Sequence, residues 1–112
     1  MIVCTTEQIA GKRITETLGL VKGSTIRARH IGRDVMASLR NIVGGEISDY
    51  TVMLAQAREE ALQRMIEQAE KMEASAIVGI RLASSTVTSG AAEMIAYGTA
   101  VKVVDDQSLP VK

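Results

Sequence analysis

Cysteine and histidine are the residue types that most often attack substrates or bind soft metals, and each occurs once, as Cys4 and His30. A nucleophilic Cys4 would need a nearby base or cation to favour its thiolate, and His30 is the one imidazole that can serve. A free cysteine also packs as a small hydrophobic residue, which suits the strand-like segment Ile2-Val3-Cys4-Thr5. The sequence therefore predicts no catalytic residue.

A metal site built from one chain would lack ligands. A structural zinc site takes four ligands, usually cysteine and histidine, whereas this chain has one of each. Neither has a companion at H-x-x-x-H, C-x-x-C or H-x-x-E spacing. In a symmetric oligomer, however, copies of one residue can meet between subunits. Cys4 and His30 are therefore the candidate metal ligands across subunits, and no cofactor is expected.

The acidic and glycine-containing stretches match no catalytic or phosphate-binding motif. Gly19-x-x-x-Gly23 is followed by Ser-Thr instead of the Lys-Ser of a phosphate loop, and it does not open a helix. Glu93 interrupts a strand of small residues, where we expect it to face solvent or to pair with a cation such as Arg81 across a hairpin. The other glutamates, typical of the solvated face of a helix, are Glu59, Glu60, Glu67, Glu70 and Glu73.

The charge balance argues against nucleic acid as a partner. Thirteen basic and thirteen acidic residues give a formal net charge of zero, whereas nucleic-acid binders depend on a basic surplus that faces the phosphates. No window approaches the roughly 20 apolar residues that cross a bilayer. The N-terminus also lacks the basic and apolar regions of a signal peptide. We therefore expect a cytoplasmic protein with neither a membrane nor a nucleic-acid partner.

The first part of the chain is predicted to form strands. The segment from Ile2 to Thr6 is short and rich in β-branched residues. The segment from Ile14 to Ala28 mixes β-branched residues with Gly19 and Gly23. Because glycine inside a strand pattern indicates a bulge or a bend, we expect two short strands joined by a turn at Val21-Lys22-Gly23-Ser24.

Two helices are predicted next. Apolar residues recur every three or four positions from Ile31 to Val43, and Gly44-Gly45 would stop that shorter helix. A longer amphipathic helix runs from about Ser48 to Ala74, with Ser48 or Asp49 as its N-cap. At about 1.5 Å per residue it would be about 40 Å long. Its apolar stripe comprises Leu54, Ala57, Ala61, Met65, Gln68 or Ala69, and Met72, and Glu60 and Arg64 are spaced as an ion pair.

The last part of the chain returns to strands. Ala76 to Leu82 is a strand signal, Ser84 to Gly90 is polar and small like a turn, and Ala92 to Val104 alternates with the period of a strand. The order of elements favours one α+β domain over residues 1–104, built from a small mixed or antiparallel sheet and the two helices. Asp105 to Lys112 holds the only proline and is predicted to be a flexible tail.

The amino-acid composition provides a physical reason for self-assembly. The chain has no tryptophan and no phenylalanine, although aromatic side chains are the largest contributors to a compact core, at about 150–250 Å² each. Alanine, valine, isoleucine, leucine and six methionines must fill the core instead. Small domains often compensate for a thin core by burying further surface against copies of themselves.

Several short motifs occur along the chain in a specific order. The early ones are Leu18-Gly19-Leu20-Val21-x-Gly23, Arg33-Asp34 and Gly44-Gly45. The later ones are Tyr50 opening a helix with Arg58, Ala61 and Met65, then Ala74-x-Ala76-Ile77-Val78-Gly79 and Tyr97-Gly98-Thr99-Ala100-Val101. In their order and spacing over residues 2 to 104, these motifs resemble the YbjQ-like proteins, which often carry a heavy-metal-binding label.

The resemblance implies an α+β subunit that assembles into a homopentameric ring, in which strands of neighbouring subunits form a shared barrel-like sheet. It implies no characterised function. The family commonly has glycine where this chain has Glu73. If the long helix ends there in a left-handed residue, Glu73 carries a conformational cost that glycine avoids.

Three functions are compatible with these residues. We favour a non-enzymatic protein that assembles with copies of itself and binds a small ligand or ion between subunits. The first alternative is a metal-binding or metal-trafficking protein that uses Cys4 and His30 across subunits. The second is an enzyme with a composite site at a subunit interface, for which the polar candidates are Arg33, Asp34, Tyr50 and Arg58.

Overall fold

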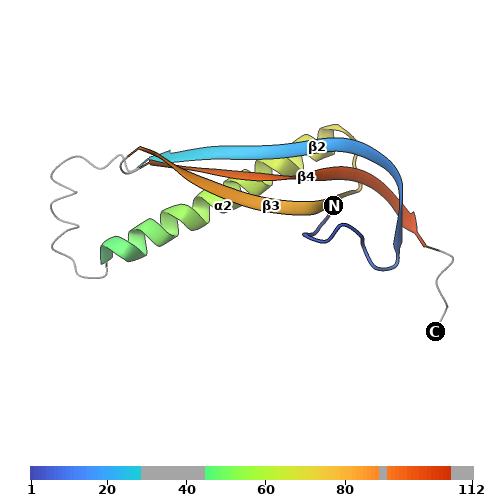
Figure 1. Cartoon of the computed structure of the whole chain (residues 1–112), viewed down its shortest axis with the longest axis horizontal. Coiled ribbons are helices and arrows are strands. Elements are labelled where there is room, and N and C mark those ends of the chain that lie inside the picture. Colours follow the sequence, from blue (N-terminus) through green and yellow to red (C-terminus); the bar gives the residue numbers. More distant parts are fainter. Residues whose placement is uncertain (29–44, 89–90, 107–112) are drawn as a thin grey trace.

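The computed structural model describes residues 1–28, 45–88 and 91–106. Along the chain these form β1 (Ile2–Val3), β2 (Lys12–Ala28), α2 (Gly45–Lys71), β3 (Ala76–Thr88) and β4 (Ala91–Asp105). The strands make one mixed sheet in the order β1-β3-β4-β2, and α2 crosses one face of it (Figure 1). The predicted α+β fold with one long helix is confirmed, whereas the shorter helix predicted from Ile31 to Val43 lies outside the described residues.

The sheet is open at both sides. β4 is central and runs antiparallel to β2 on one side and to β3 on the other. β1 pairs in parallel with the start of β3 alone, with Ile2 opposite Ala76 and Val3 opposite Ile77. Among the described residues, no strand pairs with the outer side of β2 or with the second half of β3. Most of both outer edges is therefore left without a strand partner.

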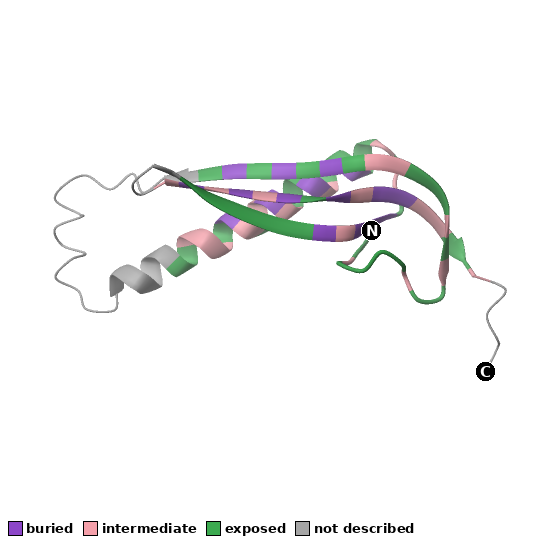
Figure 2. Cartoon of the chain, viewed as in Figure 1, coloured by how far each residue is buried: buried purple, intermediate pink, exposed green. Residues whose placement is uncertain are grey.

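The core lies where α2 crosses β2 and β4, and it is built from small residues. In the predicted stripe of α2, Ala57, Ala61, Met65 and Ala69 are each at most 1% exposed. They pack against the face of β4 that carries Met94, Ala96 and Ala100. Figure 2 shows that buried residues gather at this crossing, while β3 becomes exposed toward its hairpin end. The alternation predicted for β4 is confirmed.

The turn predicted at Val21-Lys22-Gly23-Ser24 is wrong, because β2 runs unbroken from Lys12 to Ala28. Gly23 is needed for close packing rather than for a turn. A Cβ atom at Gly23 would overlap the carbonyl oxygen of Ala61 and the backbone nitrogen of Met65 in α2. The other glycine, Gly19, has φ of 128° and lies at a register shift against β4, as expected for a bulge.

The turn predicted from Ser84 to Gly90 is wrong for Ser84 to Thr88, and residues 89–90 lie outside the described residues. β3 continues to Thr88, and Ser84 and Ser85 pair with Met94 and Glu93 of β4. Residues 81–86 are all exposed. The stretch of β3 from Ser84 to Thr86 consists of small polar residues, because its outer edge and much of its surface are exposed to solvent in the isolated chain. Turns have the same composition, so this part of the strand resembles a turn in the sequence.

Both ends of α2 differ from the predicted ends. The helix begins at Gly45, so the predicted N-caps Ser48 and Asp49 lie inside it, and Gly45 belongs to this helix instead of stopping an earlier one. Glycine is among the residues that helix starts tolerate well. At the other end the helix stops at Lys71 rather than at Ala74.

Glu73 closes the helix in the left-handed conformation, with φ of 61°. The amide of Ala74 donates to the carbonyl of Ala69 at 3.1 Å, and that of Glu73 donates to the carbonyl of Glu70 at 3.0 Å. This pair of bonds is the Schellman arrangement, in which glycine is the usual residue. The predicted cost of a glutamate at this position therefore applies to this chain.

The folded chain is elongated. Its extents are 62 × 30 × 17 Å and its radius of gyration is 18.9 Å, whereas a compact domain of this length has a radius of gyration of about 13 Å. The long β2–β4–β3 ribbon accounts for this shape (Figure 1). In the described part of the chain, no helix is both long and apolar enough to cross a membrane.

Candidate functional site

Cys4 lies just after β1 and is held by the start of β3. Its backbone amide donates to the carbonyl of Ile77 at 3.0 Å, and its own carbonyl accepts from the amide of Ile80 at 3.1 Å. The sulfur accepts from the hydroxyl of Thr6 at 3.4 Å, and the half-buried side chain packs on a cluster that includes Val78. These are the contacts of a packed strand residue.

The donors of a single described chain do not fit a heavy-metal site. Within residues 1–28, 45–88 and 91–106, no three side chains of histidine, cysteine, aspartate or glutamate gather to hold an ion. The polar atoms beside the Cys4 sulfur are the hydroxyl and carbonyl oxygens of Thr6 and the carbonyl of Ile77. Such oxygens are poor partners for the soft metals that thiolates select. His30, the second predicted ligand, lies outside the described residues.

The residues predicted for a composite enzyme site are only partly described. Arg33 and Asp34 lie outside the described residues, and Tyr50 lies in α2 with its side chain outside them. Arg58 is half-buried on the same helix. The predicted pairing of Glu93 with Arg81 is wrong: Arg81 faces Tyr97 across the hairpin and donates to the carbonyl of Thr5, while Glu93 accepts from Ser85.

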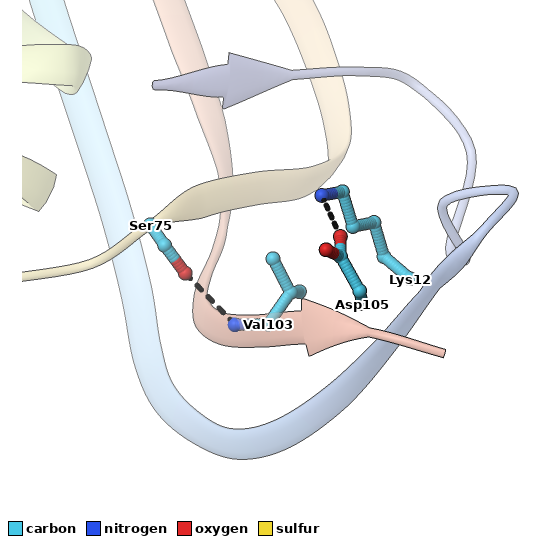
Figure 3. A network of polar contacts seen from close by, with 4 residues as sticks. All are labelled: Lys12, Ser75, Val103 and Asp105. Carbon is cyan, nitrogen blue, oxygen red and sulfur yellow. Dashed lines mark hydrogen bonds and ion pairs between the residues drawn. The ribbon is translucent and has the colours of Figure 1, made fainter. Parts of the chain in front are cut away.

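One ion pair joins the start of β2 to the end of β4. Lys12 Nζ lies 2.5 Å from Asp105 Oδ1, and Figure 3 shows this pair beside the Val103 amide, which donates to Ser75 Oγ at 2.8 Å. The hydrogen bond from Lys12, with the attraction of its charge, lowers the pKa of Asp105 below its usual range. Asp105 is the last residue of β4, and 107–112 lie outside the described residues.

A shallow pocket of about 270 Å³ lies beside this ion pair. Its lining combines two cations and one carboxylate with two isoleucines. The lining residues are Gln8, Ile9, Lys12, Arg13, Ile14 and Asp106. The pocket therefore lies where β2 begins and β4 ends.

The outer edge of β2 is the longest unpaired edge of the described sheet. At its middle, the amide of Lys22 points away from β4 and donates to Gln68 Oε1 of α2 at 2.7 Å. Two residues further on, the carbonyl of Ser24 accepts from Arg64 Nη1 at 2.5 Å. In the sequence, Gln68 was an alternative to Ala69 in the apolar stripe, and Arg64 was the predicted partner of Glu60. Neither residue was predicted to contact β2.

The same alternation of backbone directions identifies which backbone groups point outward on β3. The Lys22 backbone points outward, so Tyr97, which lies opposite it, turns its backbone toward β3, because pairing alternates along antiparallel strands. Arg81 in turn faces Tyr97. The backbone groups that point outward on β3 are therefore those of Leu82, Ser84 and Thr86.

Large apolar side chains are exposed near both edges. Leu20 is 64% exposed and Ile26 62% exposed on β2, and Leu82 is 45% exposed on β3. Tyr97, on the central strand, is 39% exposed on the face opposite α2. Leu20 and Ile26 lie on the same face of the sheet as Tyr97, whereas Leu82 pairs with Ala96 and lies on the face of α2. Exposed apolar side chains along an open strand edge favour pairing with another chain. The open edges and these side chains are the candidate functional site.

Known proteins similar to this chain share its length and its fold. A UPF0145 protein of Methanosarcina acetivorans is 56% identical over 105 residues, which cover 94% of this chain and 99% of that protein. A UPF0145 protein of Clostridioides difficile is 53% identical over 109 residues, 97% of each chain. The crystal structure of a Pediococcus pentosaceus protein of unknown function from the DUF74 family has a TM-score of 0.57 at 19% identity. That match covers 95% of this chain and 98% of the other, and it supports the fold alone.

The family model that matches spans residues 1–104 and is described as "Putative heavy-metal-binding". That span takes in all the described strands except the last residue of β4, and the whole of α2. The resemblance carried by the glycine and alanine motifs is thus confirmed, and the chain belongs to the YbjQ family.

Proposed function

We propose that this chain is a self-assembling protein whose open sheet is completed by neighbouring copies of itself in a closed ring of five. The observation that carries the proposal is the pair of unpaired outer edges, on β2 and on the second half of β3. Proteins usually cover or disrupt such edges, because the exposed amides and carbonyls pair readily with another chain. Here neither edge contains a proline.

The two edges differ, which favours a ring over a simple dimer. One belongs to a strand of 17 residues and the other to part of a strand of 13 residues. Pairing β2 of one subunit with β3 of the next is a head-to-tail contact, and head-to-tail contacts close into rings when the rotation per subunit allows. The number five comes from the resemblance to the family, and the open edges support closure of some ring.

The exposed apolar side chains supply a driving force for the contact. Burying apolar surface contributes about 25 cal/mol per Å², or about 1.5–3 kcal/mol for a whole leucine or isoleucine side chain. Leu20 and Ile26 flank the middle of β2, and Leu82 lies on the β3 edge. Contacts between neighbours would cover these residues, so assembly would supply the burial that a core without large aromatic residues lacks.

We further propose that the protein binds a small charged ligand or ion between subunits. The pocket beside Lys12 and Arg13 supports this part, because it carries charge of both signs. No specific observation favours the enzymatic alternative.

Native mass spectrometry at micromolar concentration tests the proposal. A ring of five 12.0 kDa chains has a mass of about 60 kDa, and we expect one dominant species of that mass. A monomer at this concentration would contradict self-assembly. A single closed species of another size would contradict the number five and leave the edge pairing standing.

A further inference from the structure

Two side chains of α2 form hydrogen bonds with backbone groups on the outer edge of β2. Gln68 Oε1 accepts the amide hydrogen of Lys22 at 2.7 Å, and Arg64 Nη1 donates to the carbonyl of Ser24 at 2.5 Å. Arg64 and Gln68 are four residues apart and therefore adjacent on the helix surface. Lys22 and Ser24 are two apart, so their backbone groups point to the same side of the strand. The spacing of the helix matches the spacing of the strand edge.

The position of Arg64 is fixed by a second set of contacts. Glu60 Oε1 accepts from Arg64 Nη2 at 2.6 Å and from the hydroxyl of Thr25 at 3.1 Å. Thr25 is only 5% exposed, so Glu60 is anchored to the buried side of β2. Charge-assisted bonds of this kind are shorter and stronger than neutral ones. The guanidinium is therefore held over the strand edge, with 51% of the Arg64 side chain still exposed.

We propose that Arg64 and Gln68 form a latch on β2 that competes with the strand of a neighbouring subunit. The inference rests on the proposed self-assembly. A strand that pairs along β2 must take the Lys22 amide and the Ser24 carbonyl, which the latch already binds. Assembly at this point exchanges two side-chain bonds for two backbone bonds. In the single subunit, the latch supplies hydrogen-bond partners for these two backbone groups. An incoming strand binds only if its own contacts are stronger than the two bonds that it replaces.

Substitutions at Gln68 separate competition from packing. Gln68→Met keeps the length of the side chain and loses the amide acceptor, so the Lys22 amide becomes free for a neighbour. Gln68→Glu offers a charged acceptor that binds the same amide more strongly. A net hydrogen bond corresponds to about a two- to tenfold change in an equilibrium constant. We expect the concentration at half-assembly to fall by about that factor for Gln68→Met and to rise for Gln68→Glu.

Sedimentation velocity across a dilution series measures both shifts, with Gln63→Met and Gln63→Glu as matched controls. Gln63 is an exposed residue of the same helix, and its amide contacts Glu67 rather than β2. If both Gln68 variants weaken assembly, Gln68 serves packing and the latch is refuted. Unchanged assembly in both would also refute it.

The outcomes distinguish the latch from the assembly it regulates. A wild-type monomer at micromolar concentration would contradict the proposed function, yet the latch would still predict that Gln68→Met begins to associate. A monomeric Gln68→Met variant would then overturn the latch as well. Amide hydrogen exchange at Lys22 gives a second reading, since Gln68→Met should accelerate exchange of that amide in the dissociated subunit. An unaltered rate there would contradict the latch directly.

Discussion

The two halves of the β2–β4–β3 ribbon differ in how completely one chain covers them. Where α2 crosses, Val21, Ala61 and Met65 have no measurable exposure, and a glycine is needed for the helix to approach. On the second half of β3, every residue from 81 to 86 is exposed and the outer edge has no strand partner in the described chain. The half crossed by α2 is a core of small residues that one chain buries completely. The second half has an exposed strand edge, which we propose as the contact with a neighbouring copy.

This difference between the two halves determines what a mutation in each half should change. Changes in the crossing region alter the free energy of unfolding of each subunit, because the contacts there are internal. Changes on the β3 edge should alter assembly and leave the subunit fold nearly intact.

Gly23→Ala should destabilise the fold most, by about 3 kcal/mol, because the new methyl group would overlap backbone atoms of Ala61 and Met65 that cannot rotate away. Urea unfolding measures the loss. Gly98→Ala is the matched control, since its methyl would meet Ile77 Cγ2 at 2.9 Å and Val78 O at 3.0 Å, a milder overlap that partly involves a side chain. Equal losses in the two variants would show that α2 does not press on β2 at Gly23.

Glu73→Gly should stabilise the subunit by about 1 kcal/mol, since glycine adopts a φ of 61° without the steric cost that glutamate carries. Thermal unfolding at equal protein concentration measures the gain. Glu70→Gly, at an exposed position inside the helix, should instead destabilise by a similar amount. A loss of stability in Glu73→Gly would contradict the left-handed helix end.

Asp105 gives a small, pH-dependent effect. Because Lys12 lowers the pKa of Asp105 in the folded state, the ion pair stabilises the fold at pH values above the usual pKa of 3.8. That stabilisation is lost as the pH falls through the lowered folded-state pKa. The difference in unfolding free energy between wild type and Asp105→Asn should therefore shrink from pH 7 to pH 3. A difference that stays constant would mean that the pair does not form in solution.

Cys4→Ser should leave zinc affinity unchanged, because the contacts of Cys4 within the described chain are those of a packed strand residue. Isothermal titration of the assembled protein tests this, with His30→Ala titrated alongside. A large loss of affinity in either variant would favour the metal-binding alternative and place the metal between subunits.

The periodic spacing of apolar residues correctly predicted the helix and strands that have the core on one side and solvent on the other. The small face of β4 and the stripe of α2 alternate because one side meets the core and the other does not, so Ala96, Ala61 and Met65 could be assigned to the core from sequence. The resemblance to the family pointed to Glu73 as a possible left-handed helix end, although periodicity alone extended the helix to about Ala74. At the core positions local pattern and tertiary contact agree.

The predictions failed where two different causes select the same residues. Gly23 looks like a turn residue, but close approach of a helix requires glycine just as a turn does. The small polar residues of Ser84-Ser85-Thr86 look like a loop, although they form an exposed strand. The suggested pairing of Glu93 with Arg81 rested on opposite charge alone, and charge does not determine the register, which places Arg81 opposite Tyr97.

The candidate site could not be predicted because unpaired strand edges are a property of the topology. No residue type identifies the outermost strand, and the order β1-β3-β4-β2 appears only in the folded sheet. Gln68 gave a weak signal, as a polar residue within an apolar stripe. Its contact with Lys22 spans 46 residues and depends on where α2 crosses β2.

Ser84→Pro tests the claim that neighbours complete the sheet most directly. Proline at Ser84 removes an amide that points outward on β3, and edge positions tolerate proline within the subunit itself. Analytical ultracentrifugation should show Ser84→Pro as a folded monomer, while Ser84→Ala sediments as the wild-type ring. A Ser84→Pro variant that keeps the mass of the wild-type assembly would contradict pairing through the β3 edge.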